Sequence, residues 1–147
     1  PSDPDLRQKA LDEARKALEA ADAALVLAPA RLDAYVAELN KEAEKHIKQG
    51  NDLFKLWAYE DAIKEYENAI KLRPQTLLAM NAQYCIGQSL FRAGEYDAAL
   101  ATFTNLLENN PNSTIAPVTE LMLSQVEHTM EKAFAACKND KMKKKVS

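Results

Sequence analysis

Glycine and proline, the residues that most often interrupt regular structure, are scarce in this sequence. The 147 residues include only 3 glycines and 6 prolines, whereas Ala, Leu, Glu, Lys and Asp are abundant. This composition is typical of helices joined by short connections and argues against strand-rich architectures. The length suits one domain with a buried core and is short for two. We therefore expect an all-α protein.

Positive charge is not in excess, since 19 Lys and Arg residues stand against 22 Asp and Glu residues. The net charge of -3 disfavours a nucleic-acid partner, because sequence-independent binding to phosphates needs a positive surface. No apolar run of about 18 residues occurs, so we expect no membrane span and a cytoplasmic protein. Residues 1–5 show no signal-peptide pattern. A removed upstream signal or anchor stays open, because the sequence begins with proline.

Motifs of catalysis and of cofactor binding are also missing. The sequence has no glycine-rich phosphate loop, no HExxH, no GxSxG and no paired-cysteine motif. Its histidines are His46 and His128, and His46 falls on a packing seam, where we expect a hydrogen-bonded structural imidazole. Cys85 and Cys137 are far apart, so we expect free thiols, with a disulfide between them as the minority alternative. We predict no enzyme activity, no cofactor and no metal site.

The most informative pattern that is present is an internal repeat with a period of 37 residues. The paired positions are Gly50 and Gly87, Leu53 and Leu90, Phe54 and Phe91, Lys55 and Arg92, Tyr59 and Tyr96, Ala62 and Ala99, Tyr66 and Phe103, and Pro74 and Pro111. One further step reaches Ser124, Gln125 and His128, which form a weaker third copy. Each full copy predicts two helices. We expect its glycine to let them approach closely and its later aromatic residue, Tyr66 or Phe103, to fill the space beside that glycine.

These residues resemble the signature of the tetratricopeptide repeat (TPR) family. The matching positions are Gly50, Tyr59, Ala62, Tyr66, Ala69 and Pro74, then Gly87, Gly94, Tyr96, Ala99, Phe103 and Pro111. The family's usual period is about 34 residues, so each copy here is about three residues longer, and we place the added residues near 75–79 and 112–116. The resemblance implies antiparallel helical hairpins stacked as a short solenoid over residues 43–137, with residues 115–137 as a closing helix.

Residues 1–42 show a different pattern, which predicts a coiled-coil-like helical hairpin continuous with the repeats. Leu11, Leu18 and Leu25 recur every seven residues, with alanine between them. We expect Pro29 to break this helix, and a second helix to run from near residue 30 into the first repeat. About six or seven helices are then expected in total. The alternative for the apolar seam is pairing between two chains, which gives a homodimer.

Residues 138–147 form a basic tail that contains five lysines. Such a cluster after the last apolar helix position is most often a disordered, solubilising end, and we expect one here. An electrostatic contact with an acidic partner or a lipid surface stays open as an alternative, and so does a nuclear-import signal.

The resemblance implies a function in protein–protein interaction. In TPR proteins the first helix of each hairpin lines a concave surface that receives a partner segment, so we expect a non-catalytic adaptor or scaffold. The candidate groove residues are Lys48, Asn51, Phe54, Lys55, Tyr84, Gln88, Phe91, Arg92, Gln125 and His128. One alternative is a self-associating structural subunit that uses the N-terminal seam. Another is that Phe54 and Phe91 belong to the core while the polar residues form a solvated helix face.

Amide and cationic side chains suggest what this groove would bind. Asn51, Gln88 and Gln125 stand at the same point of three successive copies. An amide donates and accepts hydrogen bonds, which suits the backbone of an extended peptide. Lys55 and Arg92 would attract an acidic residue or a terminal carboxylate.

The stretch KQGNDLFK is similar to the first repeat of the carboxylate-clamp co-chaperones, which are TPR proteins. Two positions depart from that clamp, because Ile47 stands where it needs lysine and Cys85 where it needs asparagine. Binding of a chaperone tail is therefore the lesser alternative. The identity of the partner stays open.

Overall fold

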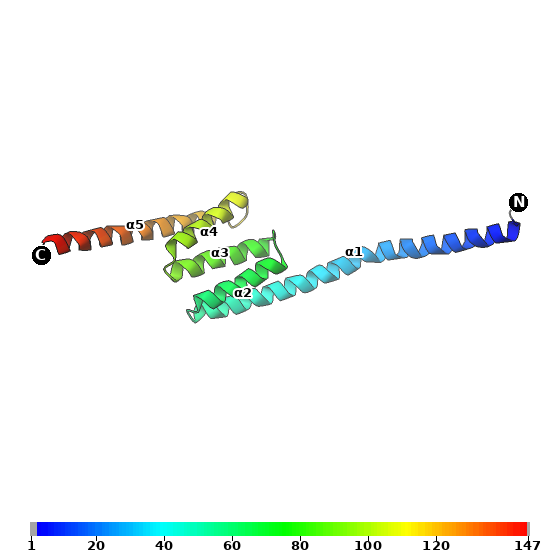
Figure 1. Ribbon diagram of the computed structural model, residues 1–147, viewed down its shortest axis with the longest axis horizontal. Helices are drawn as coiled ribbons and strands as arrows, with labels where there is room; N and C mark the ends of the chain where they lie inside the picture. Colours follow the sequence, from blue (N-terminus) through cyan, green and yellow to red (C-terminus); the bar gives the residue numbers. More distant parts are fainter. Residues whose placement is uncertain (1–2, 147) are drawn as a thin grey trace. The chain divides into compact units, whose positions relative to one another are not determined.

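The computed structural model describes residues 3–146, with side chains for residues 3–140. Over these residues it contains no strand and five helices, which are α1 (Pro4–Lys55), α2 (Tyr59–Leu72), α3 (Leu77–Arg92), α4 (Tyr96–Asn109) and α5 (Ala116–Val146) (Figure 1). The prediction of an all-α protein is confirmed. No helix of the described chain is both long and apolar enough to cross a membrane. The chain divides into two units, residues 1–39 and residues 40–147.

The N-terminal unit is the first part of α1. The predicted hairpin is wrong, because α1 continues through Pro29. A proline inside a helix costs about 3 kcal/mol, since it removes one hydrogen bond and crowds the preceding turn. The neighbours Ala28 and Ala30 favour helix, however, and no glycine or asparagine is present there to reverse the chain. One long helix therefore replaces the predicted pair, and the described residues form five helices rather than six or seven.

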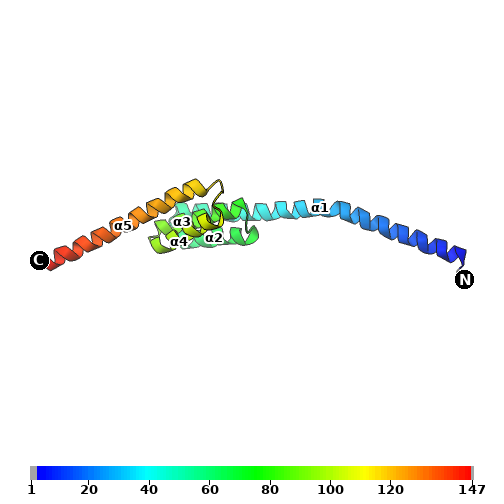
Figure 2. The ribbon, with the colours of Figure 1, turned by 90° about the horizontal axis from the view of Figure 1, so that it is seen from above.

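In the C-terminal unit, each helix packs against the next one in the sequence. Figures 1 and 2 show the last part of α1 followed by α2, α3, α4 and α5 in order. Residues 40–55 form the first hairpin with α2, and α3 forms the second with α4. The first part of α5 then covers α4. This arrangement confirms the stacked hairpins that the repeat predicts.

The turns of the two hairpins have nearly the same backbone angles at positions 37 residues apart. The residue before the second helix has φ -85° and ψ 67° at Ala58, and φ -84° and ψ 69° at Glu95. The residue after that helix has φ -134° and ψ 63° at Arg73, and φ -139° and ψ 59° at Asn110. The sequence repeat is therefore also a repeat of backbone conformation.

The same correspondence explains a strained residue in the first hairpin. Gly94 begins the turn of the second hairpin with a φ of 84°, a conformation that suits glycine. The equivalent residue of the first hairpin is Trp57, which has a φ of 65° and a side chain that is 80% exposed. Trp57 therefore adopts a left-handed conformation without burying its ring in return.

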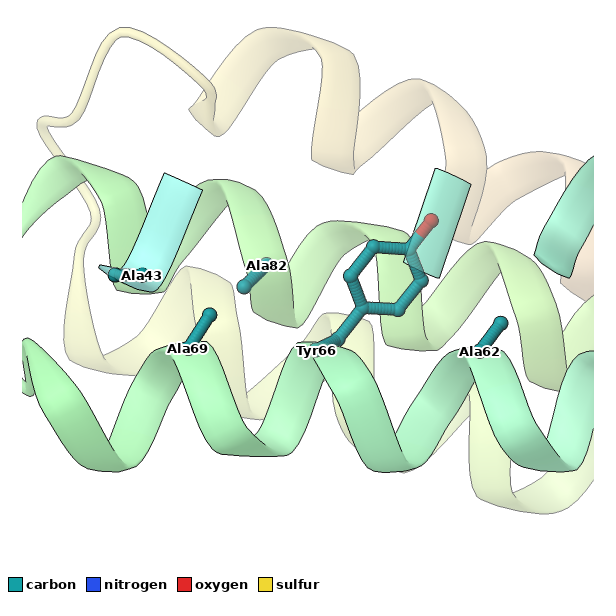
Figure 3. Packing of buried hydrophobic residues seen from close by; sticks show 5 residues of the cluster. All are labelled: Ala43, Ala62, Tyr66, Ala69 and Ala82. Atoms are coloured by element: carbon teal, nitrogen blue, oxygen red, sulfur yellow. The ribbon is translucent and has the colours of Figure 1, made fainter. Parts of the chain in front are cut away.

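Two apolar clusters form the core of this unit. The first lies between α1, α2 and α3 and consists of Ala43, Ala62, Tyr66, Ala69 and Ala82 (Figure 3). The second joins α4 to α5 and consists of Ala99, Phe103 and Val126. Each cluster thus places one large ring among small side chains, which lets neighbouring helices approach closely.

The glycines at equivalent repeat positions face these rings, as predicted. A Cβ atom at Gly50 would lie 2.7 Å from Cε1 of Tyr66, and one at Gly87 would lie 2.5 Å from Cε1 of Phe103. Both distances are shorter than carbon atoms approach one another without repulsion. Glycine is therefore required by the packing of the ring in both copies.

Polar contacts also support the first hairpin. His46 Nδ1 lies 2.6 Å from Glu65 Oε2, so this hydrogen bond joins α1 to α2, as expected for a structural imidazole. Cys85 and Cys137 are both free thiols, which confirms that prediction.

The closing helix is longer than expected. α5 continues past Cys137 to Val146, because no glycine or proline ends it. Much of the predicted basic tail is therefore helical in backbone. The side chains of Lys141, Lys143, Lys144 and Lys145 lie outside the described residues.

Candidate functional site

A hollow of about 350 Å³ opens between the end of α1 and α3. It is lined by Asn51, Phe54 and Lys55 from α1, Tyr66 from α2, and Cys85 and Gln88 from α3. Four of these six residues are among the ten predicted for the groove, namely Asn51, Phe54, Lys55 and Gln88. The structure therefore brings residues of the first and second repeats to one place.

Helical spacing explains why these side chains share one face. Asn51, Phe54 and Lys55 are three and four residues apart, and so lie on the same side of α1. Cys85 and Gln88 have the same relation on α3. Asn51 and Gln88 are 37 residues apart and therefore hold equivalent positions in the two repeats. Because equivalent helices stack, both amides line the same hollow.

Each of these two amides is held by a tyrosine hydroxyl. The hydroxyl of Tyr66 donates a hydrogen bond to Asn51 Oδ1 over 2.6 Å. The Nε2 group of Gln88 donates to the hydroxyl of Tyr84 over 3.4 Å. Asn51 thus keeps its N–H groups as donors for a ligand, and Gln88 keeps its carbonyl oxygen as an acceptor.

The rim of the hollow carries positive charge. Lys55 lines it, and the guanidinium of Arg92 lies over the ring of Phe54 with 5.6 Å between Cζ and the ring centroid. The same ring packs against Tyr59 in a T-shaped arrangement, at 5.4 Å between centroids. Phe54 is therefore fixed in orientation, and its contact with Arg92 positions a cation beside the hollow.

The inner wall is uncharged. Burial, followed by the nearby Cys85, raises the pKa of the Tyr66 hydroxyl above its ordinary value. Burial also raises the pKa of the Cys85 thiol, and the hydrogen bond with Tyr66 partly offsets that rise. At neutral pH both groups are protonated, so a ligand meets neutral groups inside and cations at the rim.

The remaining predicted residues have other surroundings. Tyr84 packs against Phe103 with 5.6 Å between ring centroids, and Phe91 packs against the second apolar cluster. Lys48 is exposed on α1, while Gln125 and His128 are exposed on α5 and are not among the residues that line the hollow. The alternative of a core role is thus correct for Phe91, whereas Phe54 contacts the core and also lines the hollow.

Two lining residues, Tyr66 and Cys85, were not among the predicted groove residues. Tyr66 was assigned to the gap beside Gly50, and the structure places its ring there while its hydroxyl reaches Asn51. The available signal was the difference between copies, because Phe103 has no hydroxyl at the equivalent position. A polar atom added to a core ring needs a hydrogen-bond partner, and this one reaches the surface.

A larger hollow of about 610 Å³ lies elsewhere, and its lining residues are Ile70, Gln75, Thr76, Ala79, Met80, Gln83, Asn109 and Asn110. Several of its polar side chains already serve the fold. Thr76 accepts from the N–H of Ala79 at the start of α3, and Asn110 donates to the carbonyl of Leu106 at the end of α4. The smaller hollow is the better candidate for a site, because its amides Asn51 and Gln88 stand at equivalent repeat positions and each is held by a tyrosine hydroxyl.

Within the described side chains, no three His, Cys, Asp or Glu residues converge on a point that could hold a metal ion.

Comparison with known families gives a match of residues 47–114 to the family model of the tetratricopeptide repeat. The match covers the end of α1 and all of α2, α3 and α4. Searches of curated proteins and of solved structures gave no match.

Proposed function

Because residues 47–114 belong to the tetratricopeptide repeat family, we propose that the chain binds an extended segment of a partner protein in the hollow between α1 and α3. Repeats of this family are generally non-catalytic modules of protein–protein interaction. The observation that carries the proposal is the pair of oriented amides at equivalent positions, Asn51 and Gln88. A non-catalytic adaptor or scaffold is the function that follows.

The two amides together offer both the donors and the acceptor that a peptide backbone requires for hydrogen bonding. An extended backbone offers carbonyl oxygens and N–H groups at regular intervals. Asn51 offers N–H donors for a carbonyl, and Gln88 offers a carbonyl for an N–H group. Because a tyrosine already holds each amide, less side-chain freedom is lost when the segment binds.

Charge and volume narrow the description of the segment. A hollow of about 350 Å³ is at the lower limit of small-molecule pockets, so it suits one or two peptide side chains better than a cofactor. Phe54 provides an apolar surface for one of them. Lys55 and Arg92 favour an acidic residue or a terminal carboxylate next to it. Lys48, Gln125 and His128 stay predicted contacts for parts of the segment beyond the hollow.

The expected partner is a protein rather than a nucleic acid, because the net charge of -3 provides no general attraction for phosphates. A chaperone tail held by a carboxylate clamp is disfavoured by the structure of the hollow. Ile47 packs against the first apolar cluster, and the partly buried Cys85 keeps its proton. Neither residue supplies the cation or the amide that such a clamp uses.

The test is selection of binders from a displayed library of random linear peptides, followed by titration of the selected peptides against variants. We expect Asn51→Ala with Gln88→Ala to weaken binding at least tenfold, because two peptide hydrogen bonds are lost. Gln83→Ala with Asn109→Ala is the matched control, since it removes two amides from the larger hollow. Arg92→Ala should weaken only peptides that carry an acidic group, and added salt should reduce that effect.

Equal affinity for the wild type and the Asn51 and Gln88 variant would show that the segment binds elsewhere. Weakening by the control pair alone would transfer the site to the larger hollow. Helicity measured by circular dichroism must be unchanged in all variants for the comparison to hold.

A further inference from the structure

The strongest feature outside the proposed site is an uncovered apolar stripe along the N-terminal part of α1. Every residue from 3 to 35 is exposed. Leu11, Leu18, Leu25 and Leu32 form this leucine seam, and each is 56–70% exposed. Helices in proteins owe most of their stability to packing of an apolar face. The N-terminal unit has only this one helix, so it contains no surface to cover its own seam.

From this seam we infer that the N-terminal part of α1 pairs with the same segment of a second copy of the chain, in antiparallel orientation, over residues 4–35. This inference is independent of the proposed function, which concerns the C-terminal unit.

The alternation of large and small residues selects the orientation. Ala14, Ala21 and Ala28 follow the first three seam leucines by three residues, so the apolar face alternates leucine and alanine. In a parallel pair, leucine faces leucine and alanine faces alanine in alternate layers. The leucine layers then force the two helices apart, and this separation leaves the alanine layers poorly packed. In an antiparallel pair Leu11, Leu18 and Leu25 each face an alanine, so the helix separation is uniform over these layers, while Leu32 faces Arg7 of the second copy near the end of the overlap. Ala10, Ala17 and Ala24 flank the seam on one side and allow close approach.

Charge fixes the register of this pair. When Leu18 lies opposite Ala21 of the second copy, Arg15 lies opposite Asp22 of the second copy on the flank of the seam, and the reverse contact forms as well. A shift by seven residues in one direction brings Asp22 opposite Asp22. The same shift in the other direction brings Arg15 opposite Arg15. Only the first register pairs opposite charges, and the other two are disfavoured by repulsion.

The length of the paired segment agrees with the exposure of the helix. In this register, residue 4 lies opposite residue 35 of the second copy, so the overlap runs from 4 to 35. α1 begins at Pro4, and Val36 is the first partly buried residue. The overlap therefore covers the exposed stretch and ends where burial within the chain begins.

The first test measures the mass of the full chain over a range of concentrations by sedimentation equilibrium. We expect a dimer, and Leu18→Glu should make the chain monomeric at concentrations where the wild type is dimeric. Ala23→Glu, which adds the same charge on the opposite face of α1, should leave the dimer intact. A wild-type chain that is monomeric throughout, or that forms trimers or larger assemblies, would overturn the inference, the first result pointing to another protein as the occupant of the seam.

Charge exchange tests the register. Arg15→Asp should raise the dissociation constant of the dimer roughly tenfold, because two attractive pairs become repulsive. Asp22→Arg should do the same, and the double variant should restore the wild-type value. Failure of the double variant to restore the wild-type dissociation constant would exclude this register. Unfolding would not account for such a failure, because Arg15 and Asp22 are both exposed on the helix.

Spin-label distances test the orientation in the full chain with Cys85→Ala and Cys137→Ser. A label on a single introduced cysteine reports the distance between the two copies. In the antiparallel register, labels at Lys9→Cys are offset by about 32 Å along the helix axis and labels at Lys16→Cys by about 10 Å. The Lys9 distance should therefore be clearly the longer one. Equal distances at both positions would establish a parallel pair and refute the proposal.

Discussion

Replacing Gly87 with alanine should destabilise the chain, although the same change usually stabilises a helix. Alanine is favoured over glycine in a helix interior by about 0.8–1.0 kcal/mol. At Gly87 the added methyl carbon would lie 2.5 Å from Cε1 and Cζ of Phe103. This distance is about 1 Å below the optimal separation of two carbons. The ring, the new methyl group or a helix must therefore move.

The ring has little room to do so. Phe103 is completely buried, and it packs with Ala99 and Val126 in the second apolar cluster. Adding a methyl group to a well-packed core costs about 1–3 kcal/mol, and the severity of this overlap indicates the upper part of that range. After the helix-propensity gain is subtracted, we expect a net loss of about 1–2 kcal/mol in the free energy of unfolding.

Urea denaturation followed by circular dichroism provides the measurement, with an expected fall in the midpoint of roughly 0.5–1 M. A double-mutant cycle identifies the cause. Phe103→Leu removes the two ring atoms that would overlap, so Gly87→Ala should cost little in that background, with a coupling of about 1 kcal/mol or more. Ser124→Ala is the matched control, because Ser124 holds the equivalent position of the third copy and is exposed. It should change stability by only a few tenths of a kcal/mol.

A higher urea midpoint for Gly87→Ala than for the wild type would refute the reasoning, because it would mean that the core accommodates the added methyl group without loss of stability. Independent, additive effects of Gly87→Ala and Phe103→Leu would refute it too, since they would show that the ring is not what excludes the methyl group.

Three further predictions concern other parts of the chain. Trp57→Gly should raise the free energy of unfolding by about 0.5–1 kcal/mol in urea denaturation, because relief of the left-handed conformation outweighs the extra freedom of glycine in the unfolded chain; a loss of stability would show that the exposed ring makes an important contact. An alkylating reagent should modify Cys137 before Cys85, because burial raises the pKa of the Cys85 thiol and keeps it protonated; the alkylation rate of Cys85 should rise only as pH climbs above the ordinary thiol range. Because this pKa is raised in the folded state, the contribution of the Cys85 thiol to stability is complete below about pH 8 and is lost as pH rises. Equal alkylation rates of the two cysteines, measured by mass spectrometry at pH 7, would contradict the raised pKa of Cys85. Pro29→Ala should slow hydrogen exchange of the amides around residue 29, because it restores a hydrogen bond within a continuous helix, whereas unchanged exchange would support the chain break that the sequence suggests.

The fold of the repeats could be predicted because several signals coincide every 37 residues. Gly50 and Gly87 are informative only together with Tyr66 and Phe103, and the distances between them confirm the close approach. A lone glycine in a helix is ambiguous, but a glycine paired twice with a ring at the same spacing specifies a packing arrangement.

The predicted N-terminal hairpin is wrong because it depends on one local signal, Pro29. Pro29 lowers helix stability at one residue, whereas the helix on both sides depends on many alanines and leucines. A proline marks a break reliably only when residues that favour a turn accompany it, and none do here. The same reasoning applies to the end of α5, where the lysine-rich sequence predicts disorder but contains no residue that ends a helix.

The candidate site could be predicted in part. Asn51, Phe54, Lys55 and Gln88 come together because stacking of equivalent helices aligns equivalent positions. Tyr66 was missed because its ring and its hydroxyl serve different purposes, and a pattern of apolar positions describes only the ring. Whether these residues bind a partner stays a prediction.

The equal backbone angles at the two hairpin turns have a consequence for how such a chain can change in length. The turn inside each hairpin repeats, whereas the links that follow differ, since residues 73–76 join α2 to α3 and residues 110–115 join α4 to α5. A further hairpin joined by a link of the first kind would stack on its neighbour as the second hairpin stacks on the first. Duplication of a 37-residue copy would therefore add one more side chain at the position of Asn51 and Gln88, at the same interval. The surface that carries these amide positions can therefore grow only by whole hairpins. Evolution or engineering can lengthen it by duplicating a repeat, without a new sequence motif.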